Sequence, residues 1–243
     1  MNFSLEMGPH TDLENLPPVK DVYITLLPDG NYKENSRKAG NLVKKGFNPV
    51  PHFPARSISD EKELKDYVSR CKDVGVKQAL IIGGSRDPIG KFDNSLQILE
   101  TGYFEEIKIG IAGHPEGSPD ISDSNLEKAM IDKKPYADYM VTQWLLDAQP
   151  IIDFISKQTV PVHVGITGPM KILSLIKFAN IVGAKNSINF LKSNFGKALD
   201  LLKPRDPNDL IDKVKKFSEN FHIYTFGSLK ETNKWLKENN YVK

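Results

Sequence analysis

The chain has 243 residues, 39% of them hydrophobic, which is enough material for one complete hydrophobic core. Its 33 basic residues nearly balance 31 acidic ones, and because the lysines are scattered rather than gathered into a basic stripe, we expect no nucleic-acid partner. Apolar runs stay well short of the roughly 20 residues that cross a bilayer, and the start of the chain lacks the plan of a signal peptide, so we expect a cytoplasmic protein with no membrane partner.

Eight short β-rich runs recur along the chain, and most are separated by stretches of helical periodicity. The predicted strands cover 3–7, 21–27, 48–53, 78–84, 107–114, 138–145, 160–166 and 222–228. The predicted helices cover 32–46, 59–75, 124–133, 150–158, 169–183 and 229–239, with two extra helices near 186–202 and 208–219 before the last strand. The segment after the first strand, residues 9–20, is too short and proline-rich for a full helix.

This alternation of strands and helices is typical of repeated βα units around a parallel sheet. We therefore expect an α/β protein, a (β/α)8 TIM barrel that forms a single domain over residues 1–243. Its first helix would be shortened, and extra helices would precede the last strand. A doubly wound sheet is the alternative architecture.

In a barrel of this kind, functional groups collect at the carboxyl ends of the strands and in the loops that follow. Each polar residue at these ends has a structural explanation when taken alone, such as a hydrogen-bonded core histidine or a buried amide. Their convergence on one face of the barrel favours a binding or catalytic site. The residues in question are Glu6, Thr25, His52, Gly83, Gly84, Asp87, His114, Glu116, Gln143, Tyr224 and Thr225.

The sequence offers no His/Cys cluster at zinc-ligand spacing and no repeated carboxylates of the kind that hold Mg²⁺, so we expect no metal. It also lacks the G-x-G-x-x-G and Walker patterns of nucleotide-binding loops. The segment S-D-S-N-L-E-K predicts a helix start with Ser124 as N-cap and Glu127 as its capping-box partner. Because helix N-termini attract anions and Lys128 lies in the first turn, this start is a candidate for holding a nucleotide's phosphates.

Seven segments, in order along residues 3–228, resemble motifs of the methylenetetrahydrofolate reductase family. They are FSLEMGPH, ITLLPDG, VPHFPARS, IGIAGHPEGSPD, ADYMVTQWLLD, VHVGITGP and HIYTFGS. The sharpest match is the T-Q-x-x-x-D pattern at Thr142, Gln143 and Asp147. The resemblance implies a flavin-dependent barrel that converts 5,10-methylenetetrahydrofolate to 5-methyltetrahydrofolate with electrons from NAD(P)H. It implies FAD as the cofactor, with FMN as the alternative.

The same resemblance implies roles for individual residues. Glu6 matches the family's general acid, and because its strand is apolar we expect its pKa to be raised. The complete set of implied site residues is Glu6 and Asp87 as catalytic residues, Thr25, His52, Gly84, Asp87, His114, Glu116, Asn125 and Lys128 around the cofactor, and Gln143 and Tyr224 around the folate.

Two departures from the family pattern leave an alternative open. Ser228 stands where the family has an arginine for the folate tail, and the helix after the first strand is largely missing. Within the cofactor site, Ser118 replaces a histidine that contacts the ADP part of the cofactor. The alternative is a flavin- or folate-binding barrel that is non-catalytic or depends on a complex, and the chain could equally be a homo-oligomer or a complex subunit. A Schiff-base aldolase is disfavoured, because no predicted strand end supplies a lysine.

Overall fold

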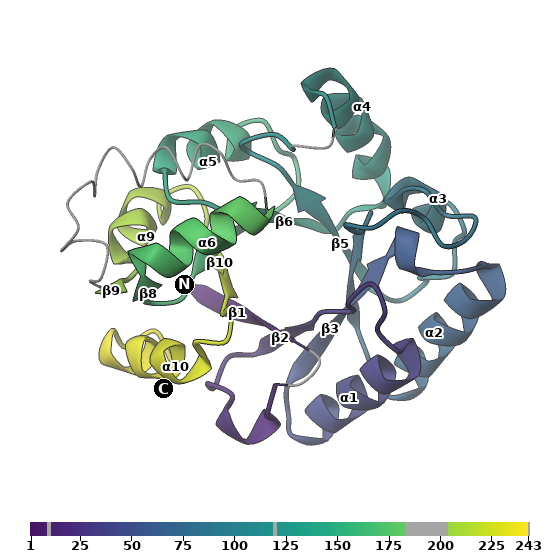
Figure 1. Cartoon of the computed structure of the whole chain (residues 1–243), viewed down its shortest axis with the longest axis horizontal. Helices are drawn as coiled ribbons and strands as arrows, with labels where there is room; N and C mark the ends of the chain where they lie inside the picture. The colour runs from purple at the N-terminus through teal and green to yellow at the C-terminus, as the bar shows by residue number, and fades with distance from the viewer. Residues whose placement is uncertain (9–10, 119–120, 183–203, 243) are drawn as a thin grey trace.

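The computed structural model of the chain describes residues 1–8, 11–118, 121–182 and 204–242. Eight parallel strands form one closed barrel in the order β1-β10-β7-β6-β5-β4-β3-β2, and helices surround it (Figure 1). This confirms the predicted single-domain TIM barrel, and the doubly wound alternative is wrong because such a sheet has open edges. The extra helix predicted near 186–202 falls outside the described residues.

All eight predicted strands are present in the barrel. Several end earlier than predicted, because the polar residues at their carboxyl ends turn into loops. Thr25 and Gly84 therefore lie in loops at the mouth of the barrel rather than in strands. The strands are β1 (Asn2–Met7), β2 (Asp21–Ile24), β3 (Asn48–Pro54), β4 (Gln78–Ile82), β5 (Lys108–Gly113), β6 (Tyr139–Trp144), β7 (Val162–Thr167) and β10 (Asn220–Tyr224).

The predicted helices cover the outside of the barrel. The shortened first helix is confirmed, because among the described residues between β1 and β2 the only helical element is one 3₁₀ turn, η1 (Leu13–Asn15). In the described part of the chain, no helix is long and apolar enough to cross a membrane. The main helices are α1 (Tyr32–Lys44), α2 (Glu61–Asp73), α4 (Asp123–Lys133), α5 (Ala148–Ile155), α6 (Ile172–Val182), α9 (Asn208–Val214) and α10 (Leu229–Glu238).

Some short elements were not predicted from the sequence. Helix α3 (Ser95–Leu99) has five residues, too few to display a helical period, and it begins with a capping box between Asn94 and Gln97. Outside the barrel, β8 (Met170–Lys171) pairs antiparallel with β9 (Pro204–Arg205). Two further 3₁₀ turns are η2 (Ala55–Ser57) after β3 and η3 (Lys134–Tyr136) after α4.

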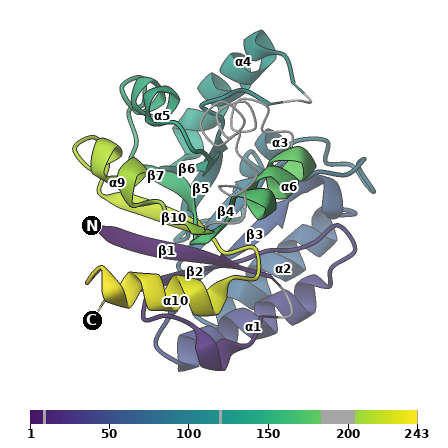
Figure 2. The same ribbon diagram turned by 60° about the vertical axis from the view of Figure 1, so that its left-hand side comes forward.

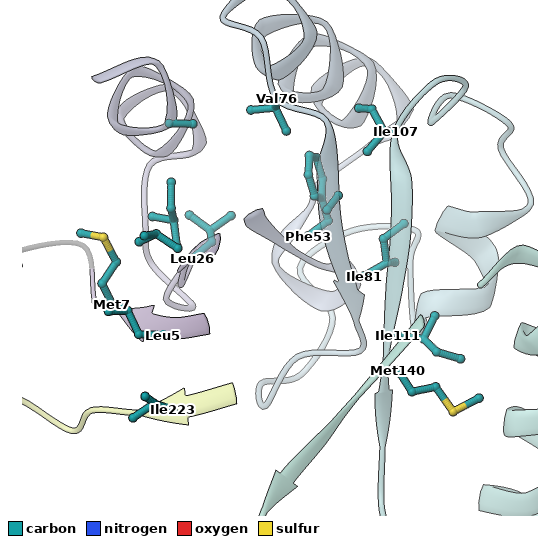
Figure 3. Close-up of a cluster of buried hydrophobic side chains, with 14 of the residues drawn as sticks. Leu5, Met7, Leu26, Phe53, Val76, Ile81, Ile107, Ile111, Met140 and Ile223 are labelled. Atoms are coloured by element: carbon teal, nitrogen blue, oxygen red, sulfur yellow. The ribbon is translucent and has the colours of Figure 1, made fainter. Parts of the chain in front are cut away.

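Two hydrophobic layers hold the barrel together. The outer layer lies between strands and helices and includes Ile81 and Ile111, which Figure 3 shows on neighbouring strands. Leu5 and Met7 belong to this outer layer, so the alternation along β1 turns Glu6 to the barrel interior. The inner layer consists of Tyr23, Val50, Leu80, Tyr139 and Val141, with Ile82 packed against it.

An aromatic cluster packs α10 and the residue Tyr241 that follows it against β1 and β10 on the outside of the barrel. Phe3 of β1 stacks on Phe221 at 5.6 Å between ring centroids and on Tyr241 at 4.7 Å, and it meets the edge of Trp235 in α10 at 6.0 Å. Figure 2 shows α10 running beside β1, with both chain termini at the end of the barrel where β1 begins. The polar residues predicted at the strand ends therefore gather at the opposite, carboxyl-terminal mouth.

Gly165 of β7 is a position where the sequence permits unusually close strand contact. A Cβ atom there would overlap the carbonyl oxygen of Thr142 and lie 2.5 Å from that of Gln143. Because those atoms belong to the backbone of β6 and cannot swing away, we expect Gly165→Ala to lower the free energy of unfolding by about 1–3 kcal/mol. Denaturant titration measures this. Gly83→Ala, where a Cβ would meet nothing within 4 Å, is the control and should leave the midpoint nearly unchanged.

Candidate functional site

Two histidines, from strands that are far from β1 in the sequence, lie beside the Glu6 carboxylate inside the mouth of the barrel. Nε2 of His52, on β3, lies 3.6 Å from Glu6 Oε2, and Nε2 of His222, on β10, lies 3.8 Å from the same oxygen. Both imidazoles are buried, whereas the Glu6 side chain is 23% exposed. Ser4 Oγ lies 3.0 Å from His222 Nδ1 and so fixes the plane of that ring. Glu6 is thus the exposed end of a buried polar cluster.

The pKa of Glu6 is lowered below its usual 4.5, so the expectation of a raised pKa was wrong. Burial alone would raise it, but the nearby imidazoles of His222 and His52, together with the Thr25 hydroxyl, outweigh burial. The apolar neighbours that suggested a raised pKa point to the outer layer, away from the carboxylate. Glu6 is consequently a carboxylate at neutral pH.

His52 contributes to this site in a different way from the one predicted. Burial, partly offset by Glu6, lowers the His52 pKa, and the nearby His222 lowers it further. The ring is therefore neutral near pH 7. Because His52 is only 4% exposed and its Nε2 faces Glu6, little of it is open to a ligand in the mouth.

A continuous arc of polar residues runs from Glu6 along β10 and β6 to β5. Tyr224 is the register partner of Glu6, and its hydroxyl donates to the Thr142 carbonyl at 3.0 Å. The next residue, Gln143, places Oε1 3.2 Å from Nδ1 of His114. Burial and, to a lesser degree, Lys133 lower the pKa of His114, while Gln143 opposes them. The structure thus brings four of the predicted site residues into one arc.

Aromatic rings form an apolar wall beside this arc. Phe226, just after β10, stacks on Phe178 of α6 with 4.2 Å between ring centroids and an interplanar angle of 16°. The Tyr224 ring lies nearly parallel to the Phe226 ring, with 6.1 Å between centroids. The Trp144 ring meets the Phe226 ring edge-on, with 6.0 Å between centroids. A wall of this kind suits the face of a planar ligand.

The loops after β2, β3 and β4 line an open cleft of about 710 Å³, next to the end of the arc that Glu6 forms on β1. This volume falls in the range of small-molecule sites. The predicted residue Asp87 is exposed in the cleft. Gly84 adopts φ +93°, a conformation that favours glycine, and its carbonyl faces Arg56 at 3.5 Å from Nη1. The cleft is lined by Pro28, Asp29, Arg56, Ser85, Arg86 and Asp87.

The remaining predicted residues lie apart from the arc. Asn125 and Lys128 are exposed on α4, and Glu116 is half-buried in the loop after β5. The predicted capping box at Ser124 is wrong, because α4 begins two residues earlier with Ser122 as N-cap and no side-chain cap hydrogen bond. Asp147 accepts a hydrogen bond from the backbone of Gln149 and caps α5. The last position of the sharpest motif therefore has a structural role.

Several residues near the site were missed by sequence reasoning. His222 and Ser4 could have been found from alternation, because each lies two residues before a predicted site residue and therefore on the same strand face. Arg56 lies in the three-residue turn η2 and Arg86 in the loop after β4, and neither segment is long enough to display a periodic signal. Lys133 is buried at the end of α4, and burial lowers its pKa. Within the described ranges, no three His, Cys, Asp or Glu side chains are arranged to hold a metal ion.

No protein-family model matches the chain. Among solved structures, the chain is similar to an uncharacterized protein from Clostridium thermocellum that binds two copies of 5-methyl-5,6,7,8-tetrahydrofolic acid. The match has a TM-score of 0.64 and 13% sequence identity, and it covers 100% of this chain and 95% of the other protein. The chain also resembles an oxaloacetate acetylhydrolase (TM-score 0.55, 10% identity, 99% of this chain and 81% of that one). A third similar structure is a 2,3-dimethylmalate lyase of the PEP mutase/isocitrate lyase superfamily (TM-score 0.56, 8% identity, 99% and 84%). At these identities the likeness establishes the barrel fold.

Proposed function

We propose that the mouth of this barrel binds a reduced folate, with Glu6 and Gln143 on the pterin ring. The observation that carries the proposal is the ionised Glu6 carboxylate, held at the start of the arc that ends in Gln143 and His114. A reduced pterin presents adjacent N–H donors and a carbonyl acceptor. A carboxylate and a primary amide offer the complementary groups.

Two further observations support this ligand class. The aromatic wall of Phe178, Phe226 and Tyr224 offers a flat apolar surface of the kind that a pterin or aminobenzoyl ring packs against. The Clostridium thermocellum protein, which is similar in fold over 95% of its length, binds 5-methyltetrahydrofolate. Together they favour a folate over the small dicarboxylic acids suggested by the names of the other similar barrels.

The binding proposal is tested by replacing Gln143 with Leu and measuring the dissociation constant of 5-methyltetrahydrofolate by calorimetry. We expect affinity to fall about 3- to 10-fold, the effect of one lost neutral hydrogen bond. The matched control is Gln149→Leu, since Gln149 is exposed on α5 outside the arc. A wild-type protein that does not bind the folate would refute the proposal, and equal losses in both variants would remove Gln143 from the site.

The finer proposal is that the chain is a flavin-dependent reductase of the folate's one-carbon unit, with NAD(P)H as the electron source. The mouth fits a flavin in two respects: the open cleft beside the arc has room for a tricyclic ring, and Arg56 in that cleft offers a cation to a phosphate-bearing tail. Asp87 lines the same cleft. A bound flavin would supply the hydride, while the protein's own residues bind and orient the folate.

A visible spectrum separates this proposal from the alternative of a barrel that binds folate without catalysis. A flavin-dependent reductase should gain absorbance near the flavin bands, and its melting temperature should rise, when FAD or FMN is added in excess. Folate binding without either change would favour the non-catalytic alternative, which draws its support from Ser228 and from the single η1 turn after β1.

A further inference from the structure

Arg56 occupies an unusual electrostatic position in the cleft beside the arc. Its Nε donates to the Asp93 carbonyl at 2.9 Å, and its Nη1 lies 3.5 Å from the Gly84 carbonyl. In contrast to Arg86, whose Nη1 lies 3.0 Å from Asp29 Oδ1, Arg56 makes no ion pair with a carboxylate in the described part of the chain. Its positive charge is oriented by neutral carbonyl groups and is not cancelled by them.

The backbone around Arg56 is held firmly in place. Its amide donates to the Gly83 carbonyl, and its carbonyl accepts from the Ile89 amide at 3.1 Å. Gly90 passes so close to Ser59 that a Cβ there would overlap the Ser59 carbonyl. The loop after β4 is thereby clamped to the turn after β3. Arg56 is a pre-oriented cation, which loses little freedom when it binds an anion.

On the β10 side of the mouth, the position that corresponds to the resembled family's arginine carries no cation. Ser228 stands where the resembled family has an arginine, and its hydroxyl donates to the Thr225 carbonyl at 2.6 Å. An anionic tail that extends toward β10 would therefore meet a hydroxyl already engaged by the backbone. A tail that extends over β3 and β4 would meet Arg56.

We propose that Arg56 is the anion-binding residue of the mouth and takes an oxyanion group of the bound ligand. The inference rests on the proposed function, because that function says which ligands enter the mouth. Two sources carry the required chemistry: the glutamate carboxylates of a folate and the diphosphate of a flavin dinucleotide. Asp87 lines the same cleft and repels such a group, so the oxyanion lies on the Arg56 side.

The test compares Arg56→Gln and Asp87→Asn with the wild type, using ligands in pairs. One pair is 5-methyltetrahydrofolate and a 5-methyltetrahydropterin without the tail, and the other is FAD and riboflavin. In the pair whose tail reaches the cleft, Arg56→Gln should weaken binding of the anionic ligand about 10- to 100-fold. Binding of the ligand without the tail should not change. Asp87→Asn should tighten binding of the same anionic ligand, since it removes a repelling charge.

Opposite signs in the two variants are an electrostatic signature that a purely structural role would not produce. The control is Lys91→Gln. Lys91 lies in the loop after β4, as Asp87 does, but it is paired with Glu61 and does not line the cleft. Arg56→Lys should recover only part of the affinity, because an ammonium lacks the planar fork of the guanidinium. Equal losses for both members of each pair, or no loss at all, would overturn the proposal.

A third probe keeps the inference testable if the wild type binds neither folate nor flavin. N-(4-aminobenzoyl)glutamate and inorganic pyrophosphate are titrated while the Nε–Hε resonance of Arg56 is followed by NMR. We expect saturable movement of that resonance with at least one of the two anions, and weaker binding of that anion to Arg56→Gln. If the resonance moves with neither anion, Arg56 is not an anion-binding residue, whatever the fate of the proposed function.

Discussion

Under the proposed function, replacing Glu6 with Gln is expected to weaken binding of a reduced folate about 10- to 100-fold and to lower turnover of methylenetetrahydrofolate by at least the same factor. Gln keeps the shape of the side chain and removes its charge. The binding loss follows from the exchange of a charge-assisted hydrogen bond for a neutral one. Turnover falls with binding because the same contact orients the folate, and an ionised Glu6 has no proton to donate. Steady-state kinetics and calorimetry measure the two effects separately.

The pH dependence of the binding effect distinguishes a carboxylate from an acid. Because the folded-state pKa of Glu6 lies below 4.5, wild-type affinity should exceed that of Glu6→Gln by a constant factor at neutral pH. The difference should disappear as the pH falls through this lowered pKa, since a protonated Glu6 resembles Gln. A difference that already shrinks between pH 7 and pH 6 would contradict the lowered pKa and restore the original expectation of a buried acid.

Two controls locate the effect of Glu6. Glu105→Gln removes an exposed carboxylate away from the arc and should change neither binding nor turnover. Reduction of a bound flavin by NAD(P)H, measured by stopped-flow absorbance, should survive in Glu6→Gln, because that half-reaction does not use the folate. Equal loss in both half-reactions would assign Glu6 a structural role, most simply through its cluster with His52 and His222.

The sequence predicted the barrel well because its signals are local. Each strand is a short apolar run, and each long helix displays its own period, so the eightfold alternation can be read without knowledge of any tertiary contact. Failures in the fold concern elements too short for periodicity, such as α3 with five residues and the two-residue pair β8 and β9.

The candidate site was predicted only in part because its chemistry depends on contacts between segments that are far apart in the sequence. The alternation within β1 suffices to place Glu6 at the mouth, but its pKa depends on His222, which lies 3.8 Å away and comes from the last barrel strand. Arg56 has its position through carbonyls of the next βα loop, a relation that no motif in its own segment indicates. Local sequence patterns thus predict where the site lies, whereas its electrostatics can be derived only from the folded structure.

The interior of the barrel leads to the second large expected effect, a loss of stability in acid that depends on His163. This ring stacks on Tyr139 at 4.6 Å between centroids, and its Nδ1 lies 3.5 Å from the Tyr23 hydroxyl. Burial, and to a smaller extent His222, lowers its pKa from 6.5 to about 4. In the unfolded chain the same group binds a proton at higher pH, so the unfolded state gains protons first as the pH falls.

The contribution of His163 to stability is therefore fully present above about pH 6.5 and is lost as the pH falls toward about 4, with a total near 3 kcal/mol. His163→Phe keeps a ring against Tyr139 and cannot titrate. Its free energy of unfolding should therefore fall less steeply as the pH is lowered, with a slope smaller by the equivalent of about one bound proton. Urea titrations between pH 4 and 7 measure the slope. Tyr139→Phe alters the same stack without removing a group that titrates there, and it should shift the curve without changing its slope. An unchanged slope in His163→Phe would mean that water reaches this imidazole in the folded barrel.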